Sequence, residues 1–159
     1  MSKFQEYRPN VAAIVLSCEH PKKVQYLLAK KKGARRAWQF PQGGIDGQET
    51  PKEALLRELK EEIGTNDVEI VAEYPEWIRY DFPNNNKKCD KLYPFKGQNQ
   101  KYFLVRLKDT AVIKLDLDKK PEFEDYVFVD EAELFKKALY MKRRAYRRVI
   151  DYFKEKGFI

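Results

Sequence analysis

Three glutamates lie close together in the first half of the chain: Glu58, Glu61 and Glu62. In an α-helix of about 3.6 residues per turn they fall within an arc of about 100°, because residues three and four apart share a face. Like charges at this spacing destabilise a helix by a few tenths of a kcal/mol per pair. A divalent cation reverses that effect, and Mg²⁺ prefers such oxygen ligands together with water and phosphate. The glutamates are therefore candidates for a magnesium site, although a solvated acidic helix face has the same pattern.

Signals at both ends predict that these glutamates lie on a helix running from about Thr50 to Ile63. Thr50 at the N-cap and Glu53 at N3 form a capping box with Pro51 between them, and Gly64 is a typical helix stop. The helix would bury an apolar face on roughly the opposite side, formed by Leu56, Leu59 and Ile63. It would thus pack on one side and present carboxylates on the other.

Short apolar runs predict strands around this helix. The run Val11–Leu16 is unbroken, as expected of a strand buried on both faces, and Val24–Ala29 is its expected hairpin partner. The segments Gln42–Gly47 and Pro83–Gly97 are expected to be loops. Further strands are expected at Trp38–Pro41, Val68–Tyr74, Trp77–Phe82, Tyr102–Leu107 and Tyr126–Val129, and helices at Glu131–Leu139 and Lys142–Lys156. This order predicts an α/β or α+β sandwich with a mixed sheet.

The composition is that of one globular domain spanning residues 1–159, with 43% hydrophobic residues and a net charge of +7. The positive charge favours polyanions such as phosphates, nucleic acids or anionic lipid surfaces, or it serves solubility alone. Two distant cysteines, Cys18 and Cys89, and the single His20 exclude zinc-finger spacing and give no sign of a disulfide framework. Because Met1–Arg8 is polar and no apolar run could span a bilayer, we expect a cytoplasmic protein without membrane contact.

The spacing around the glutamates resembles the Nudix box. Five residues separate Gly43 from Glu49 and seven separate Glu49 from the string Arg57-Glu58-Leu59-Lys60-Glu61-Glu62-Ile63-Gly64. Every charged and glycine position of the box is present, and Thr65 stands where the family usually has an aliphatic residue. The resemblance implies a Nudix-type α/β/α sandwich with a mixed β-sheet and a loop-helix-loop catalytic box. It also implies hydrolysis of a nucleoside diphosphate linked to another group, with Mg²⁺ as cofactor, which Mn²⁺ can replace.

The resemblance also assigns roles by motif position. Arg57 is similar to the residue that orients the metal-binding carboxylates by ion pairing, and Glu49 to its partner. One of the glutamates would also act as base, and the sequence leaves open which one. The metal ligands would be, with the last on a loop outside the box, Gly43, Glu58, Glu61, Glu62 and Glu122. Metal ions position water and neutralise phosphate oxygens, so no nucleophilic Ser, Cys or His is required.

Further strings resemble the bacterial branch of RNA 5′-pyrophosphohydrolases and dinucleoside polyphosphate hydrolases. They are Tyr7–Val11, Trp38–Gly44, Gly97–Phe103, Pro121–Phe123 and Tyr146–Val149. The resemblance implies as partners RNA 5′ ends, which would be converted to monophosphates at the start of mRNA decay, or dinucleoside polyphosphates, but not DNA. A third hypothesis is a silent RNA- or nucleotide-binding module; the intact metal carboxylates speak against it.

The same branch implies a set of substrate-binding residues. Tyr80 resembles an aromatic on which RNA enzymes stack a base, although a half-buried strand tyrosine fits the spacing equally well. Met141 stands where the enterobacterial enzymes have a phenylalanine, and Lys30-Lys31 replaces an arginine pair, which loses the bidentate fork for phosphate. The full set is Arg8, Lys31, Gln39, Gln42, Tyr80, Lys101, Met141 and Lys142.

The last predicted helix carries a basic face, formed by Lys142, Arg143, Arg144, Arg147 and Arg148. Two readings remain open for these side chains. The face is either solvated or contacts RNA phosphates, and each phosphate contact would increase the salt sensitivity of binding.

Overall fold

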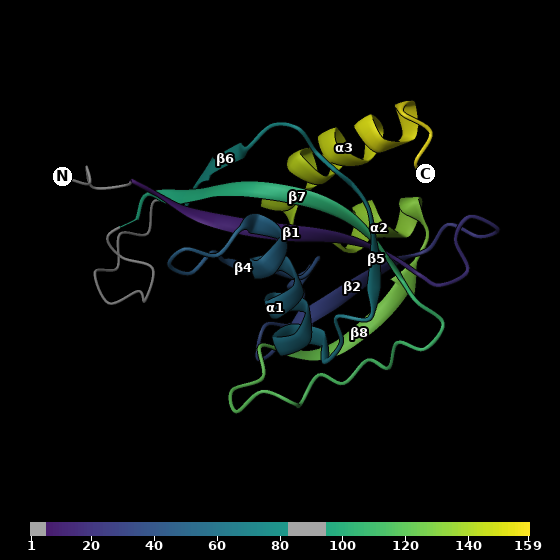
Figure 1. The fold of residues 1–159 in the computed structure, drawn as a ribbon, viewed down its shortest axis with the longest axis horizontal. Helices are drawn as coiled ribbons and strands as arrows, with labels where there is room; N and C mark the ends of the chain where they lie inside the picture. The colour runs from purple at the N-terminus through teal and green to yellow at the C-terminus, as the bar shows by residue number, and fades with distance from the viewer. Residues whose placement is uncertain (1–5, 83–94) are drawn as a thin grey trace.

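The computed structural model describes residues 6–82 and 95–159 and has a mixed sheet between helices (Figure 1). Its elements are β1 Tyr7–Leu16, β2 Tyr26–Lys31, β3 Trp38–Gln39, β4 Gln42–Gly44, α1 Pro51–Ile63, β5 Val68–Glu73, β6 Ile78–Asp81, β7 Gly97–Leu107, β8 Phe123–Val129, α2 Glu131–Lys137 and α3 Tyr140–Glu155. The predicted loop Pro83–Gly97 falls largely outside the described residues, and Gly97 itself begins β7. No described helix is long and apolar enough to cross a membrane.

The centre of the sheet is the pair of long strands β1 and β7. They run parallel in unbroken register from Tyr7 opposite Gly97 to Leu16 opposite Arg106. Every side chain of the run Val11–Leu16 is at most 1% exposed. The prediction of a strand buried on both faces is confirmed, and the strand begins earlier than expected because residues 7–10 also pair with β7.

The strands β1 and β2 diverge along most of their length. Within the described residues they pair only where Leu16 meets Tyr26, whereas β2 makes its long antiparallel pairing with β8. The hairpin predicted between Val11–Leu16 and Val24–Ala29 is therefore confined to its turn. In the opening between the two strands, Gln42–Gly44 pairs antiparallel with β1. These three residues were predicted as part of a loop and instead form β4, because the exposed edge of β1 gives their backbone a partner.

Helix α1 covers one face of the sheet, and the capping signals are confirmed. Thr50 and Glu53 exchange backbone-to-side-chain hydrogen bonds of 3.2 Å, and Gly64 ends the helix with a φ of 76°. The apolar residues that α1 buries are Ala54, Leu55, Leu59 and Ile63. Leu55 thus takes the place predicted for Leu56, since residues 55, 59 and 63 are four apart and follow one stripe.

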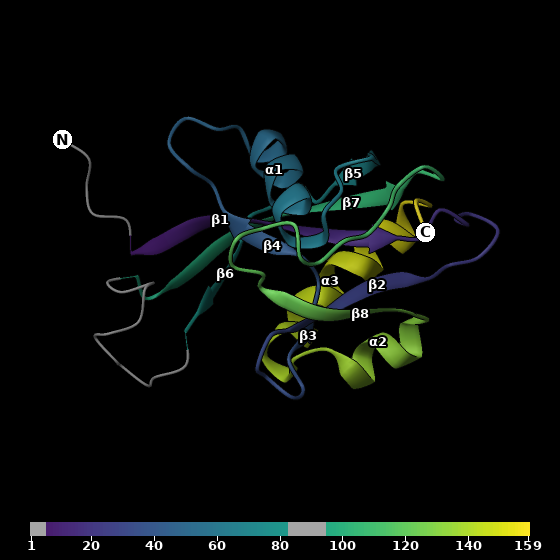
Figure 2. The ribbon, with the colours of Figure 1, turned by 90° about the horizontal axis from the view of Figure 1, so that it is seen from below.

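The opposite face of the sheet is covered by α3, with α2 beside β8 and β2 (Figure 2). Tyr146 of α3 is buried, and its hydroxyl accepts a 3.0 Å hydrogen bond from the Phe40 amide. The helix α2 ends at Lys137, earlier than predicted, because the backbone beyond it turns to the sheet, where the Leu139 amide donates to the Trp38 carbonyl. Helices on both faces of a mixed sheet confirm the predicted α/β/α sandwich.

Candidate active site

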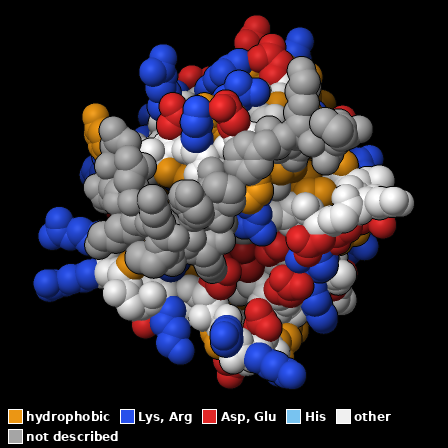
Figure 3. All heavy atoms as spheres, turned by 90° about the vertical axis from the view of Figure 1, so that its left-hand side faces the viewer, with side chains coloured by type: hydrophobic (Ala, Val, Ile, Leu, Met, Phe, Trp, Pro, Cys, Tyr) orange, Lys and Arg blue, Asp and Glu red, His pale blue; other side chains and the backbone are white. Residues whose placement is uncertain are grey.

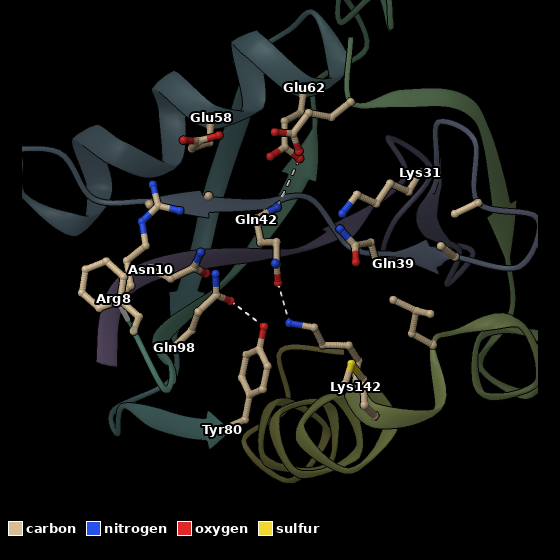
Figure 4. A pocket seen from close by; sticks show the side chains of 18 residues that line it. Arg8, Asn10, Lys31, Gln39, Gln42, Glu58, Glu62, Tyr80, Gln98 and Lys142 are labelled. Atoms are coloured by element: carbon tan, nitrogen blue, oxygen red, sulfur yellow. Dashed lines mark hydrogen bonds between the residues drawn. The ribbon is translucent and has the colours of Figure 1, made fainter. Parts of the chain in front are cut away.

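A pocket of about 660 Å³ opens where β1 and β2 diverge, so side chains from both helical layers reach it (Figure 4). Most of the predicted site residues line it: Arg8, Lys31, Gln39, Gln42, Gly43, Glu58, Glu62, Tyr80, Glu122, Met141 and Lys142. The other predicted residues, Arg57, Glu61 and Lys101, are not part of the described lining.

Glu58 and Glu62 of α1 form the acidic wall of this pocket. The side chain of Glu62 is buried, and its Oε2 accepts a hydrogen bond of 3.3 Å from the Gln42 amide. The Glu58 carboxylate lies directly against Gly43, where any Cβ would overlap it. Glycine at this position of the predicted box thus leaves room for the Glu58 carboxylate between strand β4 and helix α1.

The carboxylates of this wall are crowded as anions. Burial raises the pKa of Glu62 well above its usual range, and the charges of Glu122 and Glu58 raise it further. Burial also raises the pKa of Glu58, an effect that the neighbouring Arg57 opposes. Glu122, which comes from a loop remote in sequence, is therefore close enough to act on the same cluster.

This donor set suits a hard divalent cation. It offers carboxylate oxygens, and the single histidine of the chain, His20, is not part of the lining. Across residues 6–82 and 95–159, no three acidic, histidine or cysteine side chains are arranged to hold a metal ion unaided. A cation here would complete its coordination with water and phosphate oxygens, as Mg²⁺ usually does.

Arg57 lies behind the acidic wall and ties it to the preceding loop. Its Nε and Nη2 donate to the two carboxylate oxygens of Glu49 at 2.7 and 2.9 Å, and Nη2 also donates to the Gly44 carbonyl at 2.8 Å. Its Nη1 donates to Glu58 at 2.9 Å. The bonds to Arg57 lower the pKa of Glu49 to about 2. One guanidinium therefore fixes the positions of the loop, of β4 and of a pocket carboxylate.

Glu61 differs from the two pocket glutamates. Its carboxylate is 45% exposed and lies 3.3 Å from Nη1 of Arg57, on the outer side of the wall. The predicted arc of three glutamates therefore divides into two pocket residues and one solvent-facing residue.

Opposite the acidic wall lies a polar network in which only Gln42 has a role predicted from the sequence. The buried Gln100 donates to Asn10 Oδ1 at 2.8 Å and to Gln42 Oε1 at 2.9 Å, and it accepts from the Tyr102 hydroxyl at 3.0 Å. These bonds orient Gln42 toward the pocket. The sequence signal for this network is the run of three consecutive amides Gln98-Asn99-Gln100, which is unusual for a buried strand.

Lys142 is the most deeply buried cation of the pocket, at 3% exposure. Its Nζ donates to Gln42 Oε1 at 2.8 Å and lies 4.1 Å from the ring centroid of Tyr80 (Figure 4). Tyr80 in turn donates from its hydroxyl to Gln98 Oε1 at 2.6 Å, and burial raises its pKa to about 12. Lys142 therefore lies over one face of the Tyr80 ring, and the ring of Phe82 meets it edge-on with centroids 5.9 Å apart.

Cations surround the acidic wall. The Arg8 guanidinium lies against Gly44, and Lys31 reaches the pocket from the end of β2 (Figure 4). On the side of the molecule where β4 and β6 lie, acidic side chains gather near the centre with lysines and arginines around them (Figure 3). Such an arrangement attracts a polyanion and directs it to the acids.

Lys101, predicted to lie near the polyphosphate, is placed elsewhere. It alternates along β7 with Gln100, so it points to the α1 side of the sheet, and it is 9% exposed. Gln100, and not Lys101, reaches the described pocket through Gln42.

Three of the four arginines on the predicted basic face of α3 are engaged within the protein. Arg143 donates to the carbonyls of Ala138 and Lys136, at 2.8 and 2.9 Å. Arg147 stacks on Phe135 at 3.6 Å from the ring centroid, and Arg148 donates to Tyr74 and Glu76. These contacts hold α3 against α2 and against the segment before β6.

The model of one protein family, the NUDIX domain, matches residues 6–153 of the chain. The chain belongs to the Nudix family. Solved Nudix-fold structures agree with this: a C. elegans Ap4A hydrolase superposes with a TM-score of 0.68 at 18% identity, covering 93% of this chain and 98% of that one. An E. coli dihydroneopterin triphosphate pyrophosphohydrolase gives 0.67 at 15%, with 89% and 94% covered. At these identities the likeness concerns the fold alone.

Much more similar sequences are found among bacterial Nudix proteins named RNA pyrophosphohydrolase. The one from Sulfurovum sp. is 56% identical over 159 residues, which is the full length of both chains. The protein from Nitratiruptor sp. is 57% identical, with 97% of each chain covered, and the one from Helicobacter pylori is 53% identical, with 98% covered. The predicted branch of the Nudix family is confirmed.

Proposed function

We propose that this chain is a single-domain cytoplasmic RNA pyrophosphohydrolase. It would hydrolyse the 5′-terminal triphosphate, or diphosphate, of RNA to a 5′-monophosphate and thereby start mRNA decay. The observation that carries the proposal is the pocket itself: the acids Glu58, Glu62 and Glu122 face the cations Arg8 and Lys142 across a space of about 660 Å³. The name of the full-length relatives supports RNA as the substrate.

Mg²⁺ is the cofactor that we propose, with Mn²⁺ as a replacement. The residues that would hold it are Gly43, through its carbonyl, with Glu58, Glu62 and Glu122, and Glu61 if its exposed side chain turns inward. When bound, the ion would neutralise phosphate oxygens and make a coordinated water more acidic. The crowding of buried carboxylates, which raises the pKa of Glu62, supports this assignment because a cation would relieve it.

The chain's own residues would bind and orient the substrate. Arg57 keeps Glu58 in place through its bond of 2.9 Å, so that the carboxylate is oriented before substrate arrives. Lys31 and Lys142 would contact phosphate oxygens from the side opposite the acids. Tyr80 and Met141 would contact a base near the 5′ end, and stacking on one aromatic face tolerates any base.

The test is incubation of the purified protein and Mg²⁺ with a 5′-triphosphorylated oligonucleotide. We expect pyrophosphate release and a 5′-monophosphate end, and no reaction with EDTA. The complete absence of turnover at high enzyme concentration with either Mg²⁺ or Mn²⁺ would refute the proposal.

Dinucleoside polyphosphates are a second candidate substrate, because the acidic wall and the rim of cations recognise a chain of phosphates whatever its second end carries. A ratio of kcat/KM values for diadenosine tetraphosphate and for the RNA measures which transition state the pocket binds better. We expect the RNA to have the higher value.

A further inference from the structure

Two adjacent arginines, Arg35 and Arg36, lie at the rim of the pocket in the turn between β2 and β3. Both are exposed. The residues on either side of them, Ala34 and Ala37, line the pocket, as does Lys31 at the start of the turn. The backbone that carries the two arginines therefore forms part of the pocket mouth.

This turn is held in place by hydrogen bonds. The Lys31 amide donates to the Ala37 carbonyl at 2.9 Å, and the Ala34 amide donates to the Lys31 carbonyl at 3.2 Å. The Lys32 amide donates at 2.8 Å to the carbonyl of Glu122, an acid of the pocket. The turn thus has a fixed position relative to the acidic wall, and its arginines are presented at a defined place.

Neither Arg35 nor Arg36 has an ion pair, hydrogen bond or ring contact within the described residues. This distinguishes them from Arg143, Arg147 and Arg148, whose guanidinium groups bind carbonyls, acids and rings of the protein. Two adjacent unpaired guanidinium groups at the mouth of a polyanion pocket are available for an external anion, and they suit phosphate because the guanidinium fork matches its oxygens.

We propose that Arg35 and Arg36 form a binding surface for the phosphates of the RNA chain immediately downstream of the nucleotides held in the pocket. The inference rests on the proposed RNA activity. With the 5′ phosphates at Glu58 and Glu62, the following chain leaves through the mouth, and this turn is a fixed cationic part of it. The surface is specific to a polymer, because a substrate no larger than the pocket has no phosphate to place there.

The experiment compares the double variant Arg35→Ala/Arg36→Ala with the wild type on two substrates, a triphosphorylated dinucleotide and a triphosphorylated RNA that extends well beyond the pocket. Lys22→Ala/Lys23→Ala is the matched control, since it removes the same charge from exposed positions in the β1–β2 turn. The variant Arg35→Lys/Arg36→Lys keeps the charge and removes the fork. Binding of the 5′-monophosphorylated long RNA is titrated in parallel over a range of salt concentrations.

We expect the Arg35→Ala/Arg36→Ala variant to lose on the order of tenfold in kcat/KM on the long RNA at low salt, and clearly less on the dinucleotide. The slope of log affinity against log salt should fall by about 0.7 for each lost phosphate contact. The lysine variant should recover part of both effects, and the Lys22/Lys23 control should show neither.

Equal losses on both substrates, or an equal loss in the Lys22/Lys23 control, would overturn the proposal. If the wild type fails to turn over either RNA, the proposed function fails. The binding titration still decides the surface in that case, since an unchanged salt slope in the Arg35→Ala/Arg36→Ala variant contradicts it independently of turnover.

Discussion

The ammonium of Lys142 lies 4.1 Å from the ring centroid of Tyr80, in a position that is almost closed to solvent. Burial, followed by the charge of Lys31, lowers the pKa of Lys142 to about 7. Near neutral pH the side chain is therefore only partly protonated. Its hydrogen bond to Gln42 and its contact with the ring of Tyr80 both favour the protonated form. A bound anionic substrate would stabilise the protonated form of Lys142 and raise its pKa.

Lys142→Met should change how stability depends on pH. At pH values below about 7 the lysine is protonated in both states, and the folded protein bears the full cost of the buried charge. Between pH 7 and the ordinary value of 10.5 the unfolded chain binds more protons, so wild-type stability rises with pH, by a few kcal/mol in total. The methionine variant should lack this rise, and urea unfolding at a series of pH values measures it.

The control for this prediction is Lys22→Met, at an exposed lysine of the β1–β2 turn. Its pH profile should follow that of the wild type. Gln42 Oε1 keeps its bond from Gln100 in the Lys142 variant, so no buried acceptor is left without a partner. Parallel profiles for the Lys142 variant and the wild type would mean that the lysine retains an ordinary pKa.

Glu62→Gln should stabilise the metal-free protein and remove its response to divalent cations. Glu62 has a raised pKa, so as pH rises above 4.5 the unfolded chain releases its proton first and the folded state loses stability. Glutamine removes this cost and can still accept from the Gln42 amide.

The second part concerns the response to Mg²⁺. At a Mg²⁺ concentration a hundredfold above its Kd, the free energy of unfolding of the wild type should rise by about 2.7 kcal/mol. Thermal unfolding in EDTA and in Mg²⁺ checks both parts.

Two further variants test whether the buried charge of Glu62 is the cause of both effects. Glu19→Gln neutralises an exposed acid in the β1–β2 turn and should alter neither quantity. Glu61→Gln should give no gain in EDTA, because its carboxylate is 45% exposed. A loss of the Mg²⁺ response in this variant would show that Glu61 turns toward the cation. A Glu62→Gln protein that is less stable than the wild type in EDTA would contradict the role of burial.

Arg57→Lys should lower kcat by about 10- to 100-fold with little change in KM. A lysine cannot reproduce the paired bonds to Glu49 together with those to Glu58 and the Gly44 carbonyl. Arg57 itself does not line the pocket, so uniform substrate binding should survive. Steady-state kinetics on the triphosphorylated RNA separates the two constants, and an increase in KM at constant kcat would indicate direct substrate binding instead.

Arg57→Lys should also change how the free energy of unfolding depends on pH in the acid range. The pKa of Glu49 is lowered from 4.5 to about 2, so its contribution is present above 4.5 and is lost as pH falls toward 2. In Glu49→Gln and in Arg57→Lys, the free energy of unfolding should depend less on pH between 2 and 4.5 than it does in the wild type. Denaturant unfolding between these two pH values should show it.

The parts of the structure that local chemistry determines could be predicted from the sequence. The helix boundaries at Thr50 and Gly64 follow from a capping box and a left-handed glycine, which depend on residues a few positions apart. The buried character of Val11–Leu16 follows from its composition, since no polar residue interrupts it. The Nudix motif placed Arg57 beside Glu49, and the ion pair is present.

Features that depend on the register of distant segments could not be predicted. Gln100 and Asn10 are 90 positions apart, and their bond exists because β1 and β7 are parallel in that register. The placement of Gln100 and Lys101 on opposite faces of the sheet depends on the same pairing. The divergence of β1 from β2 likewise follows from the preference of β2 for β8, which no local signal records.

Gly43→Ala should impair catalysis while leaving the fold intact. An added Cβ would overlap the Glu58 carboxylate, which is the far end of a flexible side chain and can move aside. Stability should therefore change by no more than about 1 kcal/mol. The displaced carboxylate leaves the position beside Glu62, and a shift of about 1 Å in such a group costs on the order of 100-fold in rate. Gly44→Ala is the matched comparison, since its Cβ would displace Arg8 and should act mainly on KM. We would reject this distinction if the two variants had the same kcat, KM and free energy of unfolding. Gly43 would then have no particular effect on catalysis through Glu58, and Gly44 none on substrate binding through Arg8.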